Sequence, residues 1–205
     1  MSCGFRNPDP WHPDPVTWGF GTEEFQLVLL RRMADVQPAL VERARSGLGF
    51  SATEMRTVNA DWQRFVRSRT APRGVARFRA VLGPEESVRE QRTGDLSCLL
   101  HHWRLPLWPE LRFEAVEGPG GAVWQEWLVR EPGTAPPPVP PSGDLAPWAY
   151  VVTDLEKLFP QVKHLPPDAP SRWASTFGGP DEGAGVRLRR ALFVHGLLQE
   201  VRQAD

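Results

Sequence analysis

Residues 111–130, LRFEAVEGPGGAVWQEWLVR, hold two segments of alternating apolar and polar side chains on either side of the Gly-Pro-Gly-Gly turn at 118–121. A glycine-rich turn between two such segments is typical of a β-hairpin. We therefore predict antiparallel strands over 111–117 and 122–130. This hairpin decides the fold class, because antiparallel strands joined by short turns argue against a parallel, doubly wound sheet.

The segment before this hairpin has the spacing of helices. Apolar residues recur at helical intervals from residue 22, which predicts a first helix over 22–36. Pro38 cannot lie in the middle of a helix but suits the first turn of a second one, which we expect to end near residue 45. A third helix is predicted over 51–69.

The third helix has the clearest start signal in the sequence. Ser51 and Glu54 have the spacing of a capping box, in which each side chain accepts a hydrogen bond from the backbone of the other residue. Met55, Trp62 and Phe65 then fall on one face of the helix. We expect this face to pack against the rest of the protein.

The remaining elements are predicted from weaker patterns. Alternation over residues 75–82 predicts a strand, and residues 96–108 are compatible with a helix or a strand. A further strand is predicted over 148–153 and a short helix over 154–159. A final helix over 182–203 is expected to close the chain.

These elements predict an α+β fold, with an N-terminal helical layer packed on an antiparallel sheet and a closing C-terminal helix. Residues 1–21 read as an extended arm rich in Pro and Trp, which Phe20 and other aromatic side chains would fasten to the body. Residues 22–205 are expected to form a single domain. Within it, the proline-rich stretch 132–144 is expected to be a connecting loop.

The composition is that of an ordinary globular protein. Hydrophobic residues make up 40% of the chain, charged residues 24%, and the net charge is −1. This excludes disorder of the whole chain and any global attraction to nucleic acid or an anionic membrane. No signal peptide or membrane-spanning segment is visible, so we expect a cytoplasmic protein without a membrane partner.

One candidate functional feature is a set of arginines on and after the third helix. At 100° per residue, Arg56, Arg64 and Arg67 fall within about 80° of one another, opposite the apolar stripe. Arg69 and Arg73 follow them along the chain. A recognition helix needs such a layout, with an apolar face on the scaffold and arginines free to contact phosphates and bases. A solvated arginine face is the structural alternative.

The second candidate feature is a thiol close to two imidazoles, Cys98, His101 and His102. A nucleophilic cysteine needs a base or a positive field to form its thiolate. In a helix all three side chains would share one face, whereas in a strand Cys98 and His102 would share a face and His101 would point the other way. A buried cysteine that serves only in packing is the alternative.

No cofactor or metal is predicted. Sequence motifs for nucleotides, phosphates and metal-dependent catalysis are absent, and two cysteines do not make a zinc site. Asp9, His12 and Asp14 could supply oxygen and nitrogen ligands but do not match a spaced pattern. His195 is expected on the closing helix as a satisfied histidine at the edge of the core.

Three hypotheses for function follow. The first is a non-enzymatic binding or regulatory protein that contacts a protein partner, because the chain has nine Trp and proline-rich segments. The second is nucleic-acid binding through the arginine set. The third is a small cytosolic enzyme with a Trp-lined site near Cys98, His101 and His102.

Overall fold

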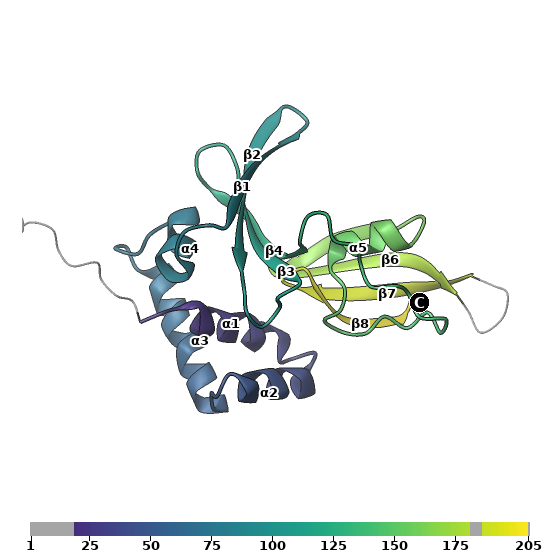
Figure 1. Cartoon of the computed structure of the whole chain (residues 1–205), viewed down its shortest axis with the longest axis horizontal. Coiled ribbons are helices and arrows are strands. Elements are labelled where there is room, and N and C mark those ends of the chain that lie inside the picture. Colours follow the sequence, from purple (N-terminus) through teal and green to yellow (C-terminus); the bar gives the residue numbers. More distant parts are fainter. Residues whose placement is uncertain (1–18, 181–185, 205) are drawn as a thin grey trace, which may run out of the picture.

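The computed structural model describes residues 19–180 and 186–204, and it places four helices at one end and two antiparallel sheets beyond them (Figure 1). The helices of this layer are α1 (Thr22–Met33), α2 (Pro38–Gly47), α3 (Ala52–Arg67) and α4 (Val75–Leu82). The first three confirm the predicted helices to within a few residues at each end. Most of the predicted arm lies outside the described residues.

Helix α3 packs on the layer as its sequence predicts. Ser51 Oγ accepts a hydrogen bond from the backbone N–H of Glu54 at 3.1 Å, and the Glu54 carboxylate accepts one from the Ser51 N–H at 2.7 Å. Met55, Trp62 and Phe65 are buried. The predicted capping box and the predicted buried face of α3 are therefore both confirmed, and the opposite face of the helix is left to solvent.

Aromatic rings join the helices to one another and to the start of the described chain. Phe20, the last aromatic residue of the predicted arm, lies 5.6 Å from both Trp62 and Phe65 between ring centroids. Phe25 on α1 lies 5.4 Å from Trp62 and 4.9 Å from Phe113. Edge-on contacts at these separations add to the hydrophobic stabilisation of the layer. Phe20 therefore fastens the chain to the body as expected.

The strand predicted over 75–82 is wrong, because these residues form helix α4. The alternation of Arg77 and Arg79 with apolar neighbours fits both periods over such a short segment. The deciding spacing is that of the buried residues Val75, Phe78 and Val81, which recur every third position and lie on one side of a helix.

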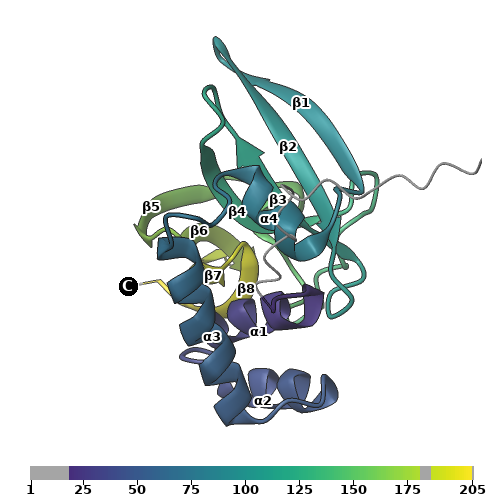
Figure 2. The ribbon, with the colours of Figure 1, turned by 90° about the vertical axis from the view of Figure 1, so that its left-hand side faces the viewer.

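The first sheet contains β1 (Ser87–Thr93), β2 (Leu96–Arg104), β3 (Leu111–Glu117) and β4 (Val123–Arg130), paired antiparallel in chain order. The predicted 111–130 hairpin is confirmed as β3 and β4, and the ambiguous segment from 96 is a strand. Strand β1 forms one edge. Figure 2 shows the β1–β2 hairpin extending away from helices α1, α2 and α3.

The second sheet contains β5 (Lys163–Ala169), β6 (Arg172–Pro180), β7 (Val186–Val194) and β8 (Leu197–Gln203), also antiparallel and in chain order. The late helix α5 (Val152–Leu158) packs beside it and confirms the predicted short helix. The α+β class is therefore confirmed, but with two sheets instead of the one that the sequence suggests. The connection between them contains the proline-rich loop, which has no helix or strand over 132–144.

The closing helix predicted over 182–203 is wrong, because its described part is the β7–β8 hairpin. The turn consists of His195 and Gly196, with φ angles of 46° and 75°. Positive φ at both central residues defines the type I′ turn that suits the twist of a hairpin. Asn or Asp usually precedes the glycine, so a histidine there hides the signal. The segment predicted as a strand over 148–153 pairs with β8 through a bridge between Val151 and Leu197 and through backbone hydrogen bonds from Trp148 N–H to the Leu198 carbonyl and from Leu198 N–H to the Tyr150 carbonyl, but it forms no full strand.

The β7–β8 turn also docks the second sheet on the first. The backbone N–H of Leu128 on β4 donates a hydrogen bond to the carbonyl of His195 at 2.7 Å. A Cβ atom added to Gly196 would lie 2.6 Å from the Leu128 carbonyl oxygen. Val194 and Leu197, on either side of the turn, belong to the same buried cluster as the helical layer. The turn therefore packs against β4 with no room for a side chain at position 196.

Gly196→Ala should destabilise the protein much more than Gly120→Ala. Both glycines have positive φ, so each substitution should cost about 1–2 kcal/mol in backbone strain. Only Gly196 also faces β4, whereas nothing lies within 4 Å of a Cβ at Gly120. Urea unfolding would measure the difference, which we expect to be on the order of 2 kcal/mol. Equal losses would contradict the tight contact of the turn with β4.

Candidate functional site

The strand conformation of β2 determines which of the candidate catalytic residues Cys98, His101 and His102 lie on the same face. Cys98 and His102 are on one face of the first sheet, and His101 is on the other. This confirms the strand alternative of the sequence analysis. Four residues of a strand span about 13 Å, so Cys98 and His102 do not form a thiol–imidazole pair. Cys98 is a buried, free cysteine.

The face that carries His102 is hollowed by an open cavity of about 590 Å³, here called the sheet cavity. All four strands contribute to it, and residues from the following loop and α5 close one end. Its lining from the sheet consists of Arg89, Gln91, Leu96, Cys98, Leu100, His102, Glu114, Val116, Trp124, Gln125, Trp127, Val129 and Arg130. Its volume lies within the range of roughly 300–1,000 Å³ that is usual for binding sites.

A row of four hydrogen-bonded side chains, here called the polar row, crosses this face with one residue from each strand. The strand register places Ser87, His102, Glu114 and Trp127 opposite one another in succession. His102 Nε2 lies 2.7 Å from one oxygen of the Glu114 carboxylate, and the Trp127 indole N–H donates to the other oxygen at 2.7 Å. Ser87 Oγ lies 3.2 Å from His102 Nδ1.

The polar row makes a rigid floor for the cavity. Both ring nitrogens of His102 and both oxygens of Glu114 have partners, and the two side chains are buried. Buried polar groups that satisfy one another in this way fix side-chain positions. Ser87 does not line the cavity. The order serine, histidine, carboxylate therefore positions His102 in the floor and presents no nucleophile to a ligand.

His101, on the opposite face, belongs to a separate ionic cluster. Its Nδ1 atom lies 2.7 Å from Glu85 and its Nε2 atom 2.8 Å from Glu117. Arg79 of α4 donates to the same Glu85 carboxylate at 2.8 Å. The hydrogen bond from Arg79 is the largest cause that lowers the pKa of Glu85 to about 2, and the bond with His101 adds to it. The cluster ties α4 to the first sheet.

Replacing Glu85 should change the pH dependence of the protein's stability. A carboxyl whose folded pKa is depressed stabilises the protein above its unfolded value of 4.5, and this contribution is lost as the pH falls toward 2. The Glu85→Gln variant should therefore have a lower melting temperature than the wild type at pH 7. The difference between the two melting temperatures should narrow as the pH falls from 4.5 to 2. Circular dichroism melts over this range would measure it, with the exposed Glu110→Gln as control. A difference in melting temperature that does not depend on pH would contradict the stabilising role of the Glu85 charge.

The rim of the sheet cavity exposes large apolar side chains. Trp124 is 52% exposed and Leu96 is 48% exposed. The Trp124 ring lies on Gly118, where any Cβ atom would come within 2.0 Å of it, so the glycine makes room for the indole. Arg89, also on the rim, is exposed and makes no ion pair with the residues that the structure describes.

Exposed apolar side chains are concentrated on the first sheet. Among the described residues, Val88, Leu99, Leu96 and Trp124 are large hydrophobic residues with at least 40% exposure, and Leu188 is the same kind of residue on the second sheet. Val88 and Leu99 lie on the face that carries His101, and Leu96 lies on the face that carries His102. The β1–β2 hairpin therefore presents apolar surface on both faces.

The five predicted arginines are all exposed. Arg56, Arg64 and Arg67 lie on α3, and Arg69 and Arg73 lie in the loop that follows it. Arg64 forms an ion pair with Asp61 of the same helix, and no other acidic partner of the five occurs in the described residues. Arg73 also reaches a hollow of about 420 Å³ that Trp124 lines, so the arginine set extends to the edge of the first sheet.

Within residues 19–180 and 186–204, no group of three His, Cys, Asp or Glu side chains is placed to hold a metal ion. Asp9, His12 and Asp14 lie outside the described residues. None of the helices that the structure describes has the length and apolar character to cross a membrane.

Comparisons with known proteins do not assign a family. No protein-family model and no curated protein matches the chain. A solved structure from Streptococcus mutans, provisionally described as a beta-lactamase inhibitor protein, is 10% identical and aligns with 68% of this chain and 86% of its own. The TM-score is 0.28, which is too low to transfer a fold or a role from that protein.

Proposed function

We propose that this chain is a non-enzymatic binding protein that acts through protein–protein contacts, with the sheet cavity and its rim as the docking surface. The observation that carries the proposal is the exposure of Trp124 and Leu96 above a rigid hydrogen-bonded floor. Half-exposed apolar side chains gathered on one face commonly mark an interaction site.

Trp124 has the physical character of a binding hot spot. Tryptophan contributes a large contact area, and binding energy is concentrated in few such residues. The close packing of the indole on Gly118 already restricts Trp124 in the free protein. Less side-chain freedom is then lost on binding, which favours affinity. Trp62, by contrast, is a core residue, so the tryptophans do not form one continuous platform.

The charges around the cavity favour a partner with an apolar segment next to a carboxylate. Glu114 is the acidic residue of the cavity lining, and its oxygens already accept hydrogen bonds from His102 and Trp127. Arg89 stands exposed at the rim near Gln91 of the same strand, whereas Arg130, the other arginine of the lining, is paired with Asp154. A partner carboxylate at Arg89 would form a charge-assisted hydrogen bond, while apolar side chains cover Trp124 and Leu96.

The geometry gives less support to an enzyme. Cys98 and His102 are separated along the strand, and His101 points away from the cavity. The nitrogens of His102 and the oxygens of Glu114 are engaged with protein partners, so neither residue is free to transfer a proton to a ligand in this arrangement.

Trp124→Ala combined with Leu96→Ser should abolish partner binding, and Leu188→Ser should not. Leu188 is as exposed as Trp124 but lies on the second sheet. A protein captured from cell extract by the wild type and by Leu188→Ser, but not by the double variant, would be purified and titrated by calorimetry. Its Kd should rise by roughly 30-fold or more in the double variant. Equal Kd values for all three proteins would contradict the proposed surface.

Nucleic-acid binding through the arginine set is the second candidate function. It is favoured by the exposure of Arg56, Arg67, Arg69 and Arg73, which have no acidic partner among the described residues. Exposed arginines along one helix face and the loop after it can contact several phosphates of one strand or duplex.

Reversing two of these charges tests the second candidate. Arg64→Glu combined with Arg67→Glu should weaken binding to random oligonucleotides and reduce the slope of log affinity against log salt by about 2, since each phosphate contact contributes about 0.9. Fluorescence anisotropy at several salt concentrations measures this slope. Arg92→Glu, an exposed residue of the β1–β2 hairpin, is the control. Unchanged binding in the double variant would exclude α3 as the site.

A further inference from the structure

A second, separate cavity lies where the helical layer meets the two sheets. It has a volume of about 290 Å³ and is here called the junction cavity. Its apolar wall comes from α1, α3 and β3 and includes the rings of Phe25, Trp62 and Phe113. The β5–β6 turn and the β7–β8 turn close the other side. Ligand sites occur preferentially at such junctions, as mostly apolar cavities with a few polar groups.

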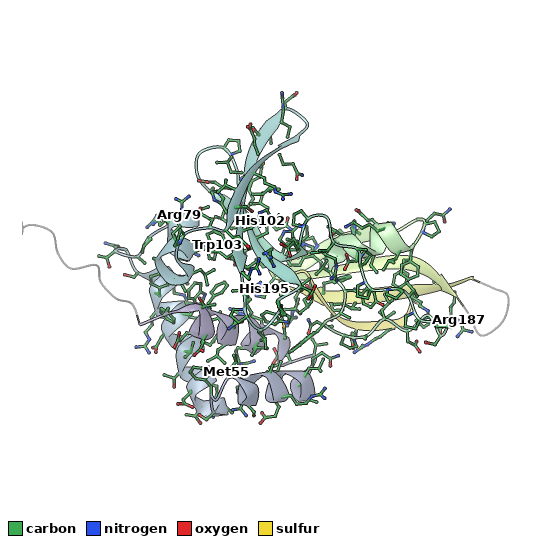
Figure 3. The ribbon with its side chains drawn as sticks, viewed as in Figure 1. Met55, Arg79, His102, Trp103, Arg187 and His195 are labelled. Carbon is green, nitrogen blue, oxygen red and sulfur yellow. The ribbon has the colours of Figure 1, made fainter. Side chains whose placement is uncertain are left out.

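Among the residues that line this cavity, His195 has a feature that hydrophobic packing does not explain. It is only 7% exposed, it lines the cavity, and its Nδ1 atom has no hydrogen-bond partner in the described part of the chain. Figure 3 shows it near the middle of the molecule. Its backbone is fixed, because its N–H donates to the Ser171 carbonyl at 2.7 Å and its carbonyl accepts from Leu128. The imidazole is therefore held in place with one nitrogen unused.

The unused nitrogen is a hydrogen-bond acceptor. Burial lowers the pKa of His195 to about 4, and the nearby positive charge of Arg32 acts in the same direction. The ring is therefore neutral at neutral pH. A hydrogen bond with the Glu126 backbone engages the ring, which leaves Nδ1 as the bare acceptor.

Charged groups of both signs face the same cavity. Arg32 of α1 and Arg77 of α4 line it, and the Nε atom of Arg77 is buried without a hydrogen bond in the described residues. Glu126 of β4 lines it too and forms no ion pair within the described chain. Burial raises the pKa of Glu126, and the positive charges of Arg77 and Arg32 partly oppose this. Each of these groups would gain from a partner of opposite charge.

Position 195 also carries a residue that its turn does not favour. A type I′ turn prefers Asn before Gly, whereas His195 adopts a positive φ of 46°. Histidine is tolerated at positive φ more often than most non-glycine residues, although Asn is the usual first central residue of this turn. Asparagine would satisfy the turn better, so the turn alone does not explain the histidine.

We propose that the junction cavity binds a small zwitterion with an aromatic side chain, an aromatic α-amino acid. Its carboxylate would pair with Arg77, its ammonium group would donate to Glu126 and to His195 Nδ1, and its ring would lie against the accessible edge of Trp62 and against Val66. Arg77, Glu126 and His195 Nδ1 then each acquire a partner, while the exposed Arg32 is left to solvent. The proposal is independent of the protein-binding function, because the sheet cavity and the junction cavity have no lining residue in common.

Calorimetry with L-phenylalanine and two truncated analogues tests this proposal. L-Phenylalanine should bind the full-length chain with a Kd below roughly 1 mM. Phenylpropionate lacks the ammonium group and 2-phenylethylamine lacks the carboxylate, and each should bind about tenfold or more weakly. No binding of L-phenylalanine at roughly 1 mM, or equal affinity for all three compounds, would overturn the proposal.

Three single substitutions assign the roles. Arg77→Gln should weaken L-phenylalanine but not 2-phenylethylamine, and Glu126→Gln should weaken L-phenylalanine but not phenylpropionate. His195→Asn should lower the affinity for L-phenylalanine about tenfold while leaving the melting temperature equal or higher, since Asn-Gly suits the turn. Affinity unchanged in His195→Asn would overturn the role of the imidazole. Trp124→Ala should bind L-phenylalanine as the wild type does, because Trp124 is outside this cavity.

Discussion

The contact between the β7–β8 turn and strand β4 holds the two halves of this molecule together. It depends on a backbone hydrogen bond from Leu128 to His195 and on the missing side chain of Gly196. The residues beside the turn, Val194 and Leu197, complete the hydrophobic cluster of the helical layer. Because backbone meets backbone here, the second sheet has little freedom to shift against the first. The junction cavity lies beside this contact, because His195 of the turn is one of its lining residues.

The polar row shows how strand pairing can build a binding floor from residues far apart in sequence. Antiparallel register brings Ser87, His102, Glu114 and Trp127 into line, although they come from four strands. Once the register is fixed, each donor meets an acceptor, and the buried carboxylate of Glu114 is compensated by its two neighbours. The apolar side chains at the rim then sit on a surface that does not rearrange. The binding function that we propose rests on this division between a fixed floor and an exposed rim.

The sequence was sufficient for elements with strong local signals and insufficient where pairing decides the outcome. The capping box at Ser51 and the glycine-rich turn at 118–121 have local chemistry that predicts their structure directly. The separation of His101 from His102 also followed once a strand was assumed. Glu114, in contrast, has no local signal, because its partners are defined by register. It could have been found by writing out the 111–130 hairpin, in which residue 114 lies opposite Trp127.

The two wrong assignments have physical causes of the same kind. Residues 75–82 are too short to separate a period of two from a period of three to four, and burial against α1 and the first sheet selects the helix. Residues 186–203 read as a helix because a histidine stands where Asn or Asp would mark the turn. The same histidine lines the junction cavity, where we propose that its imidazole contacts a ligand.

The β1–β2 hairpin also bears on how this protein avoids self-association. Strand β1 lies at the edge of its sheet, so one side of its backbone is available to a strand from another molecule. An exposed edge next to apolar side chains such as Val88 and Leu99 would ordinarily invite polymerisation. The strand reads Ser-Val-Arg-Glu-Gln-Arg-Thr, and the charges of Arg89, Glu90 and Arg92 oppose the approach of a second copy. The hairpin therefore combines exposed apolar side chains with an edge strand whose charged residues disfavour pairing with a second copy.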